Sequence, residues 1–314
     1  MKTRLILLGV LSLTLLLSSC CCVGGIDNDW NRYKNEFEKS YAIQTPASVV
    51  IRNIDGYVHV NSWDKNEVLV KGVISLRAET EKEALRRMRE INVIISHEDN
   101  SLTIRVERKK HGGLSELWRF ATNWRVDLEL SVPRECSLAI STVDGALRLS
   151  GVKGKHKLST VDGAIEAQGL EGVIDCRTVD GSCSMTDVRG DVEVSSTDGS
   201  IRVEGILTGL KAAAVDGSIH IEAMDGSTIA QEWRLSSVNG SITLGVPESF
   251  SADLEASTVD GHISIGVPAE LREMTERRVA ARLGKGGSPI SIATTDGSIR
   301  VGISGSEVKE TDDQ

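Results

Sequence analysis

The sequence predicts an all-β protein, a single-stranded β-solenoid of ~18-residue coils with a short helix and hairpin near its N-terminal end. The first observation is a Ser/Thr-Val-Asp-Gly turn that recurs from residue 141 onward. Its Asp or Asn falls at positions 144, 162, 180, 198 and 216, at intervals of 18, and then at 239, 260 and 296. The second observation is that apolar residues fill the same slots of successive units. Stacked units therefore bury inner columns that one unit cannot bury alone.

Each repeat unit contains two strands and two turns. After the Asp, apolar and polar residues alternate, as in Ile201, Arg202 and Val203. This period of two is typical of a strand with one buried face. Glycines recur every nine residues from Gly145 to Gly199 and mark both turns. We interpret Asp-Gly as a corner in which glycine adopts a positive φ, with the neighbouring Ser or Thr forming a hydroxyl ladder.

The segment before the regular repeats has other patterns. Residues 23–45 predict a polar tether with some helical character, and residues 48–74 predict alternating strands. Thr80 and Glu83 have the spacing of a capping box. Because apolar residues follow at helical spacing, residues 80–91 predict one amphipathic helix, which would cap an end of the stack.

The remaining elements are read from shorter signals. Residues 91–106 predict a hairpin, residues 110–121 a loop or short helix, and residues 124–132 another strand. Residues 268–283 predict a helix or loop insertion, since the interval from 260 to 296 is twice 18.

The N-terminus resembles the leader of a bacterial lipoprotein. Lys2 and Arg4 precede an apolar run over 5–17 that is too short to span a bilayer comfortably. Leu17-Ser18-Ser19-Cys20 follows directly and resembles a lipobox, whose cysteine carries the lipid. We therefore predict lipidation at Cys20 and a membrane partner reached through this anchor. An ordinary signal peptide with an incidental cysteine is the alternative. The protein is expected in the cell envelope, in the outer membrane because residue 21 is not Asp, with its periplasmic or surface face left open.

Four segments are similar to a bacterial family of candidate adhesins built from β-strand repeats, formerly a domain of unknown function. They are NIDGYVHVNSWDKNEVLV, the helix and hairpin of 80–106, LELSVPRECSLAISTVDGALRL and GKGGSPISIATTDGSIRVG. The resemblance covers 46–304; it implies the architecture, no defined ligand and no catalytic residues. The expected parts are a signal peptide (1–19), a tether (20–45), a β-solenoid repeat domain (46–304, regular repeats 141–304) and a charged tail (305–314).

Composition argues against several function classes. The chain has 36 basic and 45 acidic residues, a net charge of −9, and no basic run, so it is a poor nucleic-acid binder. From residue 141 onward its aromatic residues are Trp233 and Phe250, which is few for a sugar-binding platform. No carboxylate pair or Ser-His-Asp arrangement breaks the repeat to mark an active site. We therefore expect no catalytic residues, no cofactor and no enzyme, and a polysaccharide-active enzyme is the weaker alternative.

The turn column is the leading candidate site. Its members are Asp144, Asp162, Asp180, Asp198, Asp216, Asn239, Asp260 and Asp296. Stacked carboxylates repel one another, and a cation would relieve this. Asn239 fills the same turn in one copy, which favours a structural role over a cation ladder, and we expect no metal site.

Other polar residues offer weaker candidates. Of the six scattered histidines, His59, His220 and His262 lie at repeat positions near the turns, and exposed strand positions explain these three better than a metal cluster does. Cys176 and Cys183 flank one turn symmetrically, and both a disulfide and two small core residues remain open for them.

These patterns predict a lipid-anchored envelope protein that presents a rigid rod to an unknown protein or glycan, as an adhesin would. A periplasm-facing scaffold or sensory accessory protein is the alternative.

Overall fold

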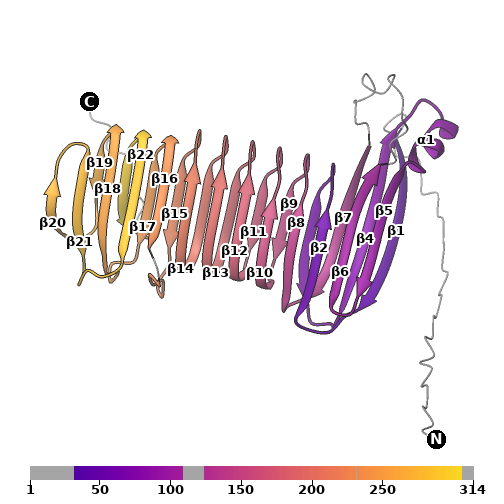
Figure 1. The fold of residues 1–314 in the computed structure, drawn as a ribbon, viewed down its shortest axis with the longest axis horizontal. Coiled ribbons are helices and arrows are strands. Elements are labelled where there is room, and N and C mark those ends of the chain that lie inside the picture. The colour runs from indigo at the N-terminus through magenta and orange to yellow at the C-terminus, as the bar shows by residue number, and fades with distance from the viewer. Residues whose placement is uncertain (1–31, 109–123, 231, 306–314) are drawn as a thin grey trace, which may run out of the picture.

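The computed structural model describes residues 32–108, 124–230 and 232–305 (Figure 1). The described chain consists of strands and turns with one short helix, so the predictions of an all-β protein and of a short helix near its N-terminal end are confirmed. No helix in this described part is long and apolar enough to cross a membrane. The predicted signal peptide, Cys20, the segment 110–121 and nearly all of the charged tail lie outside the described residues.

The elements follow one another through short turns. The N-terminal part contains β1 (Arg32–Ala42), β2 (Ala47–Arg52), β3 (Val58–Trp63), β4 (Glu67–Arg77), α1 (Glu81–Met88), β5 (Ile91–Glu98), β6 (Ser101–Arg108) and β7 (Trp124–Pro133). The central part contains β8 (Cys136–Ser141), β9 (Leu147–Ser150), β10 (Lys153–Ser159), β11 (Ile165–Gln168), β12 (Glu171–Thr178), β13 (Cys183–Ser196), β14 (Ile201–Ala214), β15 (Ile219–Ala223), β16 (Trp233–Asn239) and β17 (Ile242–Val246). The C-terminal part contains β18 (Ala252–Asp260), β19 (Ile263–Ile265), β20 (Ala269–Met274), β21 (Arg278–Leu283), β22 (Pro289–Asp296) and β23 (Ile299–Ile303).

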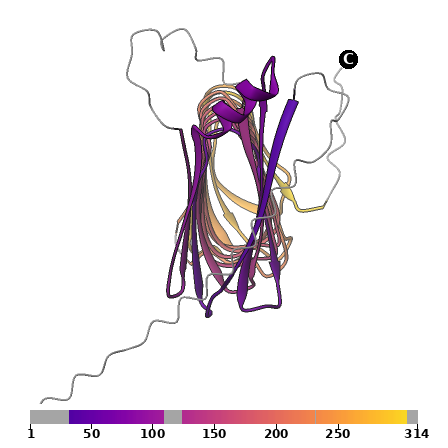
Figure 2. The ribbon, with the colours of Figure 1, turned by 90° about the vertical axis from the view of Figure 1, so that its right-hand side faces the viewer.

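Strands of successive repeats pair in parallel at a spacing of 18 residues. Leu158 of β10 lies opposite Cys176 of β12, and Ile165 of β11 lies opposite Cys183 of β13. We call each strand–turn–strand unit around an Asp-Gly turn a coil. The pairings form two rows of strands that face each other across a narrow core, as the end view shows (Figure 2).

The apolar slots predicted from the repeat form this core. Seven of them, spread along the stack, are at most 1% exposed: Leu147, Ile165, Cys183, Ile201, Ile219, Ile242 and Ile299. Each inward side chain packs on its counterparts in the adjacent coils, because parallel strands in register place equivalent residues side by side. Burial of these columns is the main favourable contribution to folding.

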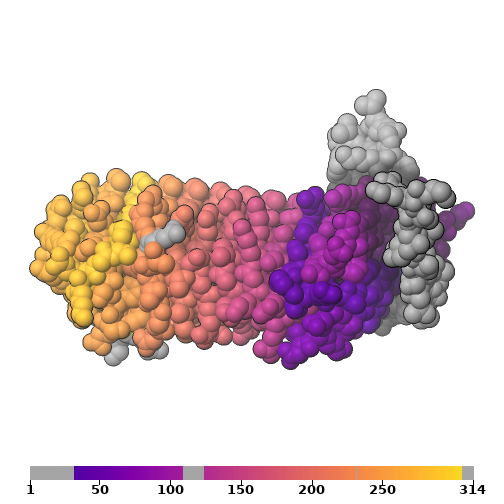
Figure 3. Space-filling model, turned by 60° about the horizontal axis from the view of Figure 1, so that its bottom comes forward, coloured from indigo at the N-terminus to yellow at the C-terminus, as the bar shows by residue number. Residues whose placement is uncertain are grey.

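The coils at the C-terminal end are not stacked in chain order. Strand β22 pairs with β16 on one side and with β18 on the other. Strand β23 lies in the same way between β17 and β19. The last coil of the chain is thus inserted between two earlier ones, seen as bright yellow between orange (Figure 3).

The N-terminal end shows the same exchange. Strand β2 pairs with both β6 and β8, and β3 pairs with both β7 and β9. The first coil, which carries the early Asp-Gly pair at Asp55, therefore stacks directly on the coil of Asp144. The regular repeats are continuous with this earlier unit.

Antiparallel strands flank the parallel stack at both ends. At the N-terminal end β4 pairs with β7, β1 with β4, and β5 with β6. At the C-terminal end β21 pairs with β18, and β20 with β21. These strands pair in the opposite direction to the coils and interrupt the parallel stack.

Two predictions fail at these ends. Residues 268–283, predicted as a helix or loop, contain β20 and β21, because Val279, Ala281 and Leu283 alternate into the core beside β18. This pairing overrides the helix propensity of the segment. Residues 32–42, predicted as tether with helical character, form β1. The N-cap half of the predicted capping box is confirmed, since Thr80 Oγ1 accepts the Glu83 N–H at 3.3 Å at the start of α1. The Glu83 carboxylate pairs with Arg87 in the next turn.

Candidate binding surface

One long edge of the stack is built from the Ser/Thr-Val-Asp-Gly turns. Most of these turns have a buried Ser or Thr whose side chain donates to a glycine carbonyl oxygen of the neighbouring coil. Thr160 donates to Gly145 at 3.2 Å, and Ser196 donates to Gly181 at 3.2 Å. The predicted hydroxyl ladder is therefore confirmed, and it links adjacent coils at their turns.

The glycine of each turn is required by close approach between coils. A Cβ atom at Gly163 would lie 2.0 Å from the Gly145 carbonyl oxygen, and one at Gly181 would lie 1.9 Å from that of Gly163. Neither residue has a positive φ, so the predicted reason for glycine is wrong at these two positions, whereas Gly56 in the first Asp-Gly turn has a φ of 110°. Positive φ values also occur at the opposite turn, for example 68° at Gly151 and 62° at Gly169.

Burial of the hydroxyl residue and close packing of the glycine leave the two residues between them facing outward. The valines of this position are between 38% and 54% exposed: Val143, Val161, Val179, Val215, Val238 and Val259. The predicted turn residues stand beside them and are all exposed: Asp144, Asp162, Asp180, Asp198, Asp216, Asn239, Asp260 and Asp296. We call these two columns together the Val–Asp edge. The valine column was missed in the sequence, although Val directly precedes the Asp or Asn in six of the nine turns, with Ile54, Thr197 and Thr295 in the other three.

The stacking order of the acidic column differs from its order in the chain. Asp296 aligns with Asn239 on one side and with Asp260 on the other. The Asn239 side-chain amide donates to Asp216 Oδ1 at 2.5 Å, so it separates two carboxylates with a hydrogen bond. Arg277 lies 3.7 Å from Asp260 at the end of the column.

Electrostatic repulsion within the column is visible at its first member. The pKa of Asp55 is raised by burial and, next, by the charge of Asp144 in the adjacent coil. Within the described ranges, no three His, Cys, Asp or Glu side chains come together as a metal site would require.

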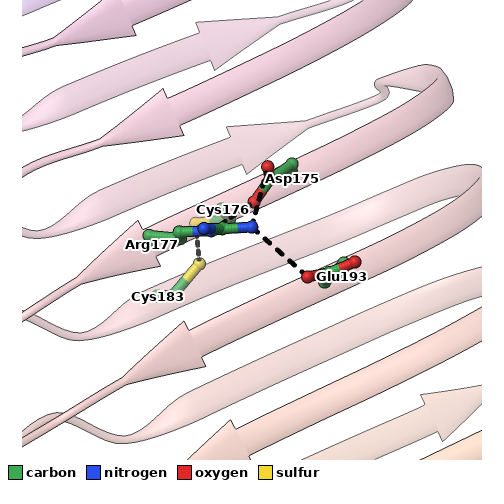
Figure 4. A network of polar contacts seen from close by, with 5 residues as sticks. All are labelled: Asp175, Cys176, Arg177, Cys183 and Glu193. Atoms are coloured by element: carbon green, nitrogen blue, oxygen red, sulfur yellow. Dashed lines mark hydrogen bonds and ion pairs between the residues drawn. The ribbon is translucent and has the colours of Figure 1, made fainter.

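The flat faces between the two edges carry mixed charge. Arg148 pairs with Glu166 at 2.9 Å, and Lys153 pairs with Glu171 at 2.8 Å, each across one coil boundary. Arg177 contacts Asp175 at 2.9 Å and Glu193 at 3.3 Å (Figure 4). Exposed pairs of this kind contribute little stability individually.

The face that carries the pair of Arg148 and Glu166 contains an open hollow of about 300 Å³. Its polar lining includes His59, Arg148, Glu166 and Ser184. Because Arg148 and Glu166 neutralise each other there, the hollow presents no strong net charge.

The histidines do not share one environment. His156 is fully buried in the inner column, where it aligns with Leu138 and Ile174. Burial lowers the pKa of His156, because the charged imidazolium is poorly solvated in an apolar core.

A comparison with known protein families finds one match to this chain. A family model described as Toastrack DUF4097 matches residues 71–302. No curated protein matches the chain.

Several solved structures are similar at low identity. A candidate cell adhesion protein from Clostridium sporogenes is 12% identical, over 85% of this chain and 98% of its own, with a TM-score of 0.26. A candidate adhesin from Bacteroides fragilis is 13% identical, over 85% and 96%, with a TM-score of 0.42. A candidate lipid binding protein from Parabacteroides distasonis is 12% identical, over 85% and 96%, with a TM-score of 0.39. At these scores the likeness carries no argument about function.

Proposed function

This chain belongs to the Toastrack DUF4097 family, and on the basis of its architecture we propose that it is a non-catalytic, lipid-anchored protein of the bacterial cell envelope. In this proposal the stacked coils form a rigid single-stranded β-solenoid that presents the Val–Asp edge to another macromolecule. The protein acts by display, as an adhesin does, and its binding surface is periodic rather than a single pocket.

Rigidity is supported by the contacts that join neighbouring coils. Parallel strand pairing, buried inner columns and the hydroxyl ladder repeat at the coil boundaries. Adjacent strands lie ~4.8 Å apart, so the nine Asp or Asn turns from Asp55 to Asp260 extend over roughly 40 Å. An edge of this length is suited to an extended or repetitive partner.

The observation that carries the proposal is the exposed valine column beside the acidic column. Valine side chains exposed in a row offer apolar area that a partner can bury, which scattered surface valines do not. The adjacent carboxylates set the sign of charge that the partner must carry. These two features favour a protein partner with basic and apolar side chains. They disfavour nucleic acid, because an acidic column repels phosphate.

The predicted lipid anchor lies close in sequence to one end of the stack, which supports an orientation in which the coils extend away from the membrane. The strand β1 begins at Arg32, 12 residues after Cys20, and lies at the end of the stack occupied by α1 (Figure 1). A lipid on Cys20 would hold this end near the membrane, and the regular coils would extend away from it.

Anchoring is tested by metabolic labelling with a palmitate analogue. Cys20→Ser is expected to abolish incorporation into the membrane-associated chain, and Cys21→Ser is the matched control that keeps it. Incorporation into Cys20→Ser at the wild-type level would contradict the lipid anchor.

Display is tested by protease treatment of intact and permeabilised cells, followed by immunoblotting. Cleavage on intact cells supports an adhesin, whereas protection until permeabilisation supports the periplasm-facing scaffold.

The edge itself is tested by replacing Val143, Val161 and Val179 with serine. Adherence of cells to a surface coated with a basic protein is expected to fall at least several-fold, while Arg148→Ser on the flat face changes it little. Equal adherence of the two variants would remove the Val–Asp edge as the binding surface.

A further inference from the structure

Two cysteines face each other across the core near the middle of the stack. Cys176 lies in β12 and Cys183 in β13, on the two sides of the turn at Asp180. Both residues are at most 1% exposed, and their Sγ atoms are 2.7 Å apart (Figure 4). Cys176 lies in the row with Leu158 of β10, and Cys183 lies in the opposite row with Ile165 of β11, so this contact joins the two rows within a single coil.

The neighbouring coils fill the same two slots with branched apolar residues. Leu158 and Ile165 occupy them one coil earlier, and Val194 and Ile201 one coil later. All four are nearly inaccessible to solvent. Replacement of such a pair by two smaller cysteines removes apolar volume from a close-packed core, and a covalent link between the sulfurs offsets that loss.

We propose that Cys176 and Cys183 form a disulfide in the exported protein, which covalently joins the two rows of strands in one coil. This inference rests on the envelope location proposed above, because disulfides persist in oxidising compartments. A separation of 2.7 Å requires only a small side-chain movement to reach the ~2.05 Å of an S–S bond.

The reaction needs an oxidant, and an exported dithiol oxidase in its disulfide form is the class that supplies it. One cysteine thiolate attacks a sulfur of the oxidase disulfide, which forms a mixed disulfide and releases one oxidase thiol. The second cysteine thiolate attacks the protein sulfur of that mixed disulfide and releases the other oxidase thiol. Two protein thiols lose two protons and two electrons, and the oxidase disulfide is reduced to a dithiol.

The bond must form before this part of the core closes. Burial and the adjacent Cys183 raise the pKa of Cys176 well above its usual value, so the reactive thiolate is scarce in the folded protein. An oxidase also cannot reach side chains that are at most 1% exposed. Oxidation therefore accompanies folding after export, and afterwards the bond is protected from reductants.

Cys136 provides an internal control. It is also buried, but its Sγ lies 3.7 Å from the Ser137 carbonyl oxygen instead of another sulfur, and burial raises its pKa to about 12. We expect Cys136 to remain a thiol in the same molecules in which the pair is oxidised.

The experiment is peptide mapping of the full chain, purified from the envelope under denaturing conditions with free thiols blocked and no reductant. Trypsin cleaves after Lys157, Arg177 and Arg189, so it separates the two cysteines into peptides 158–177 and 178–189. These peptides remain together only through a disulfide. We expect the linked pair at the summed mass less two hydrogens, and a blocked Cys136.

Recovery of both peptides separately, each with a blocked cysteine, from chain shown to be in the envelope would overturn the inference and leave the proposed location intact. If the chain is not in the envelope, the location fails, and the pair is judged by refolding the reduced chain with oxidised glutathione. Formation of the linked peptides on refolding, but not on the same treatment of folded reduced chain, supports the geometry. Absence of the link on refolding refutes it.

Discussion

The missing side chain of Gly163 faces the carbonyl oxygen of Gly145, at a distance of 2.0 Å from where its Cβ atom would lie. Gly163→Ala is therefore expected to force two coils apart and to lower the free energy of unfolding by about 3 kcal/mol or more. Gly302→Ala is the matched control, since a Cβ there meets nothing within 4 Å. Urea denaturation of both variants measures the difference, and equal midpoints would contradict the close approach.

Burial of His156 makes stability depend on pH. Its pKa is lowered in the folded chain, so the unfolded chain binds the proton more readily. The contribution of neutral His156 to the free energy of unfolding is fully present above the ordinary histidine pKa of ~6.5. It falls as the pH drops below that value, by up to about 1.4 kcal/mol per pH unit. His156→Leu, which matches Leu138 beside it, should reduce the difference in melting temperature between pH 7.5 and pH 5.0. The exposed His262→Leu should leave that difference unchanged, and a similar effect of both variants would speak against burial as the cause.

The hydroxyl ladder has a gap at Ala214. This residue is buried in register with Ser196 and Ser237, and both of those serines donate to glycine carbonyl oxygens. Ala214→Ser is expected to add the missing bond to Gly199 and to raise the free energy of unfolding by about 1 kcal/mol.

Ala212→Ser makes the same chemical change at a buried site of the same strand that lies outside the ladder position. It should destabilise the protein, because an unpartnered hydroxyl in the core costs about 1–3 kcal/mol. Thermal denaturation distinguishes the two, and a loss of stability in Ala214→Ser would show that the ladder does not stabilise the turns.

Ile219 tests the inner column directly. It is 1% exposed, so Ile219→Asp places an unpaired charge in the core at a cost of several kcal/mol. We expect loss of soluble protein or of the β-type circular dichroism spectrum. Ser218→Asp, one residue earlier and exposed, should fold normally. A soluble Ile219→Asp variant with an unchanged spectrum would refute the core assignment.

The inner columns could be predicted because burial imposes a period of two on each strand and a period of 18 on the stack. Ile165 and Ile201 repeat in the sequence for the same reason that they touch the same core. The order of coils could not be predicted in this way. Asp296 carries the same turn as Asp260, and nothing local to either residue states which of them lies next to Asn239.

Two local misreadings have physical causes. The spacing of Glu and Arg in 268–283 is compatible with a helix, but pairing with β18 decides the conformation. Both a positive φ and a close approach between coils would require glycine at position 163. Only the position of the neighbouring coil shows that close approach is the reason. The valine column could have been found by asking which turn residues remain outward once Thr160 and Gly163 are assigned inward.

The interleaved first and last coils have a consequence for how such a chain can change in length. The first and last coils of the chain lie inside the stack, and antiparallel strands cover β6 and β7 at one end and β18 at the other. A repeat appended to either terminus would therefore not simply extend the parallel stack. Gain or loss of whole 18-residue units between Asp144 and Asp216 leaves both ends of the stack unchanged and alters the length of the stack in steps of ~4.8 Å. The number of repeats in the middle of the molecule therefore sets the length of the stack, and duplication or deletion of one unit changes that length.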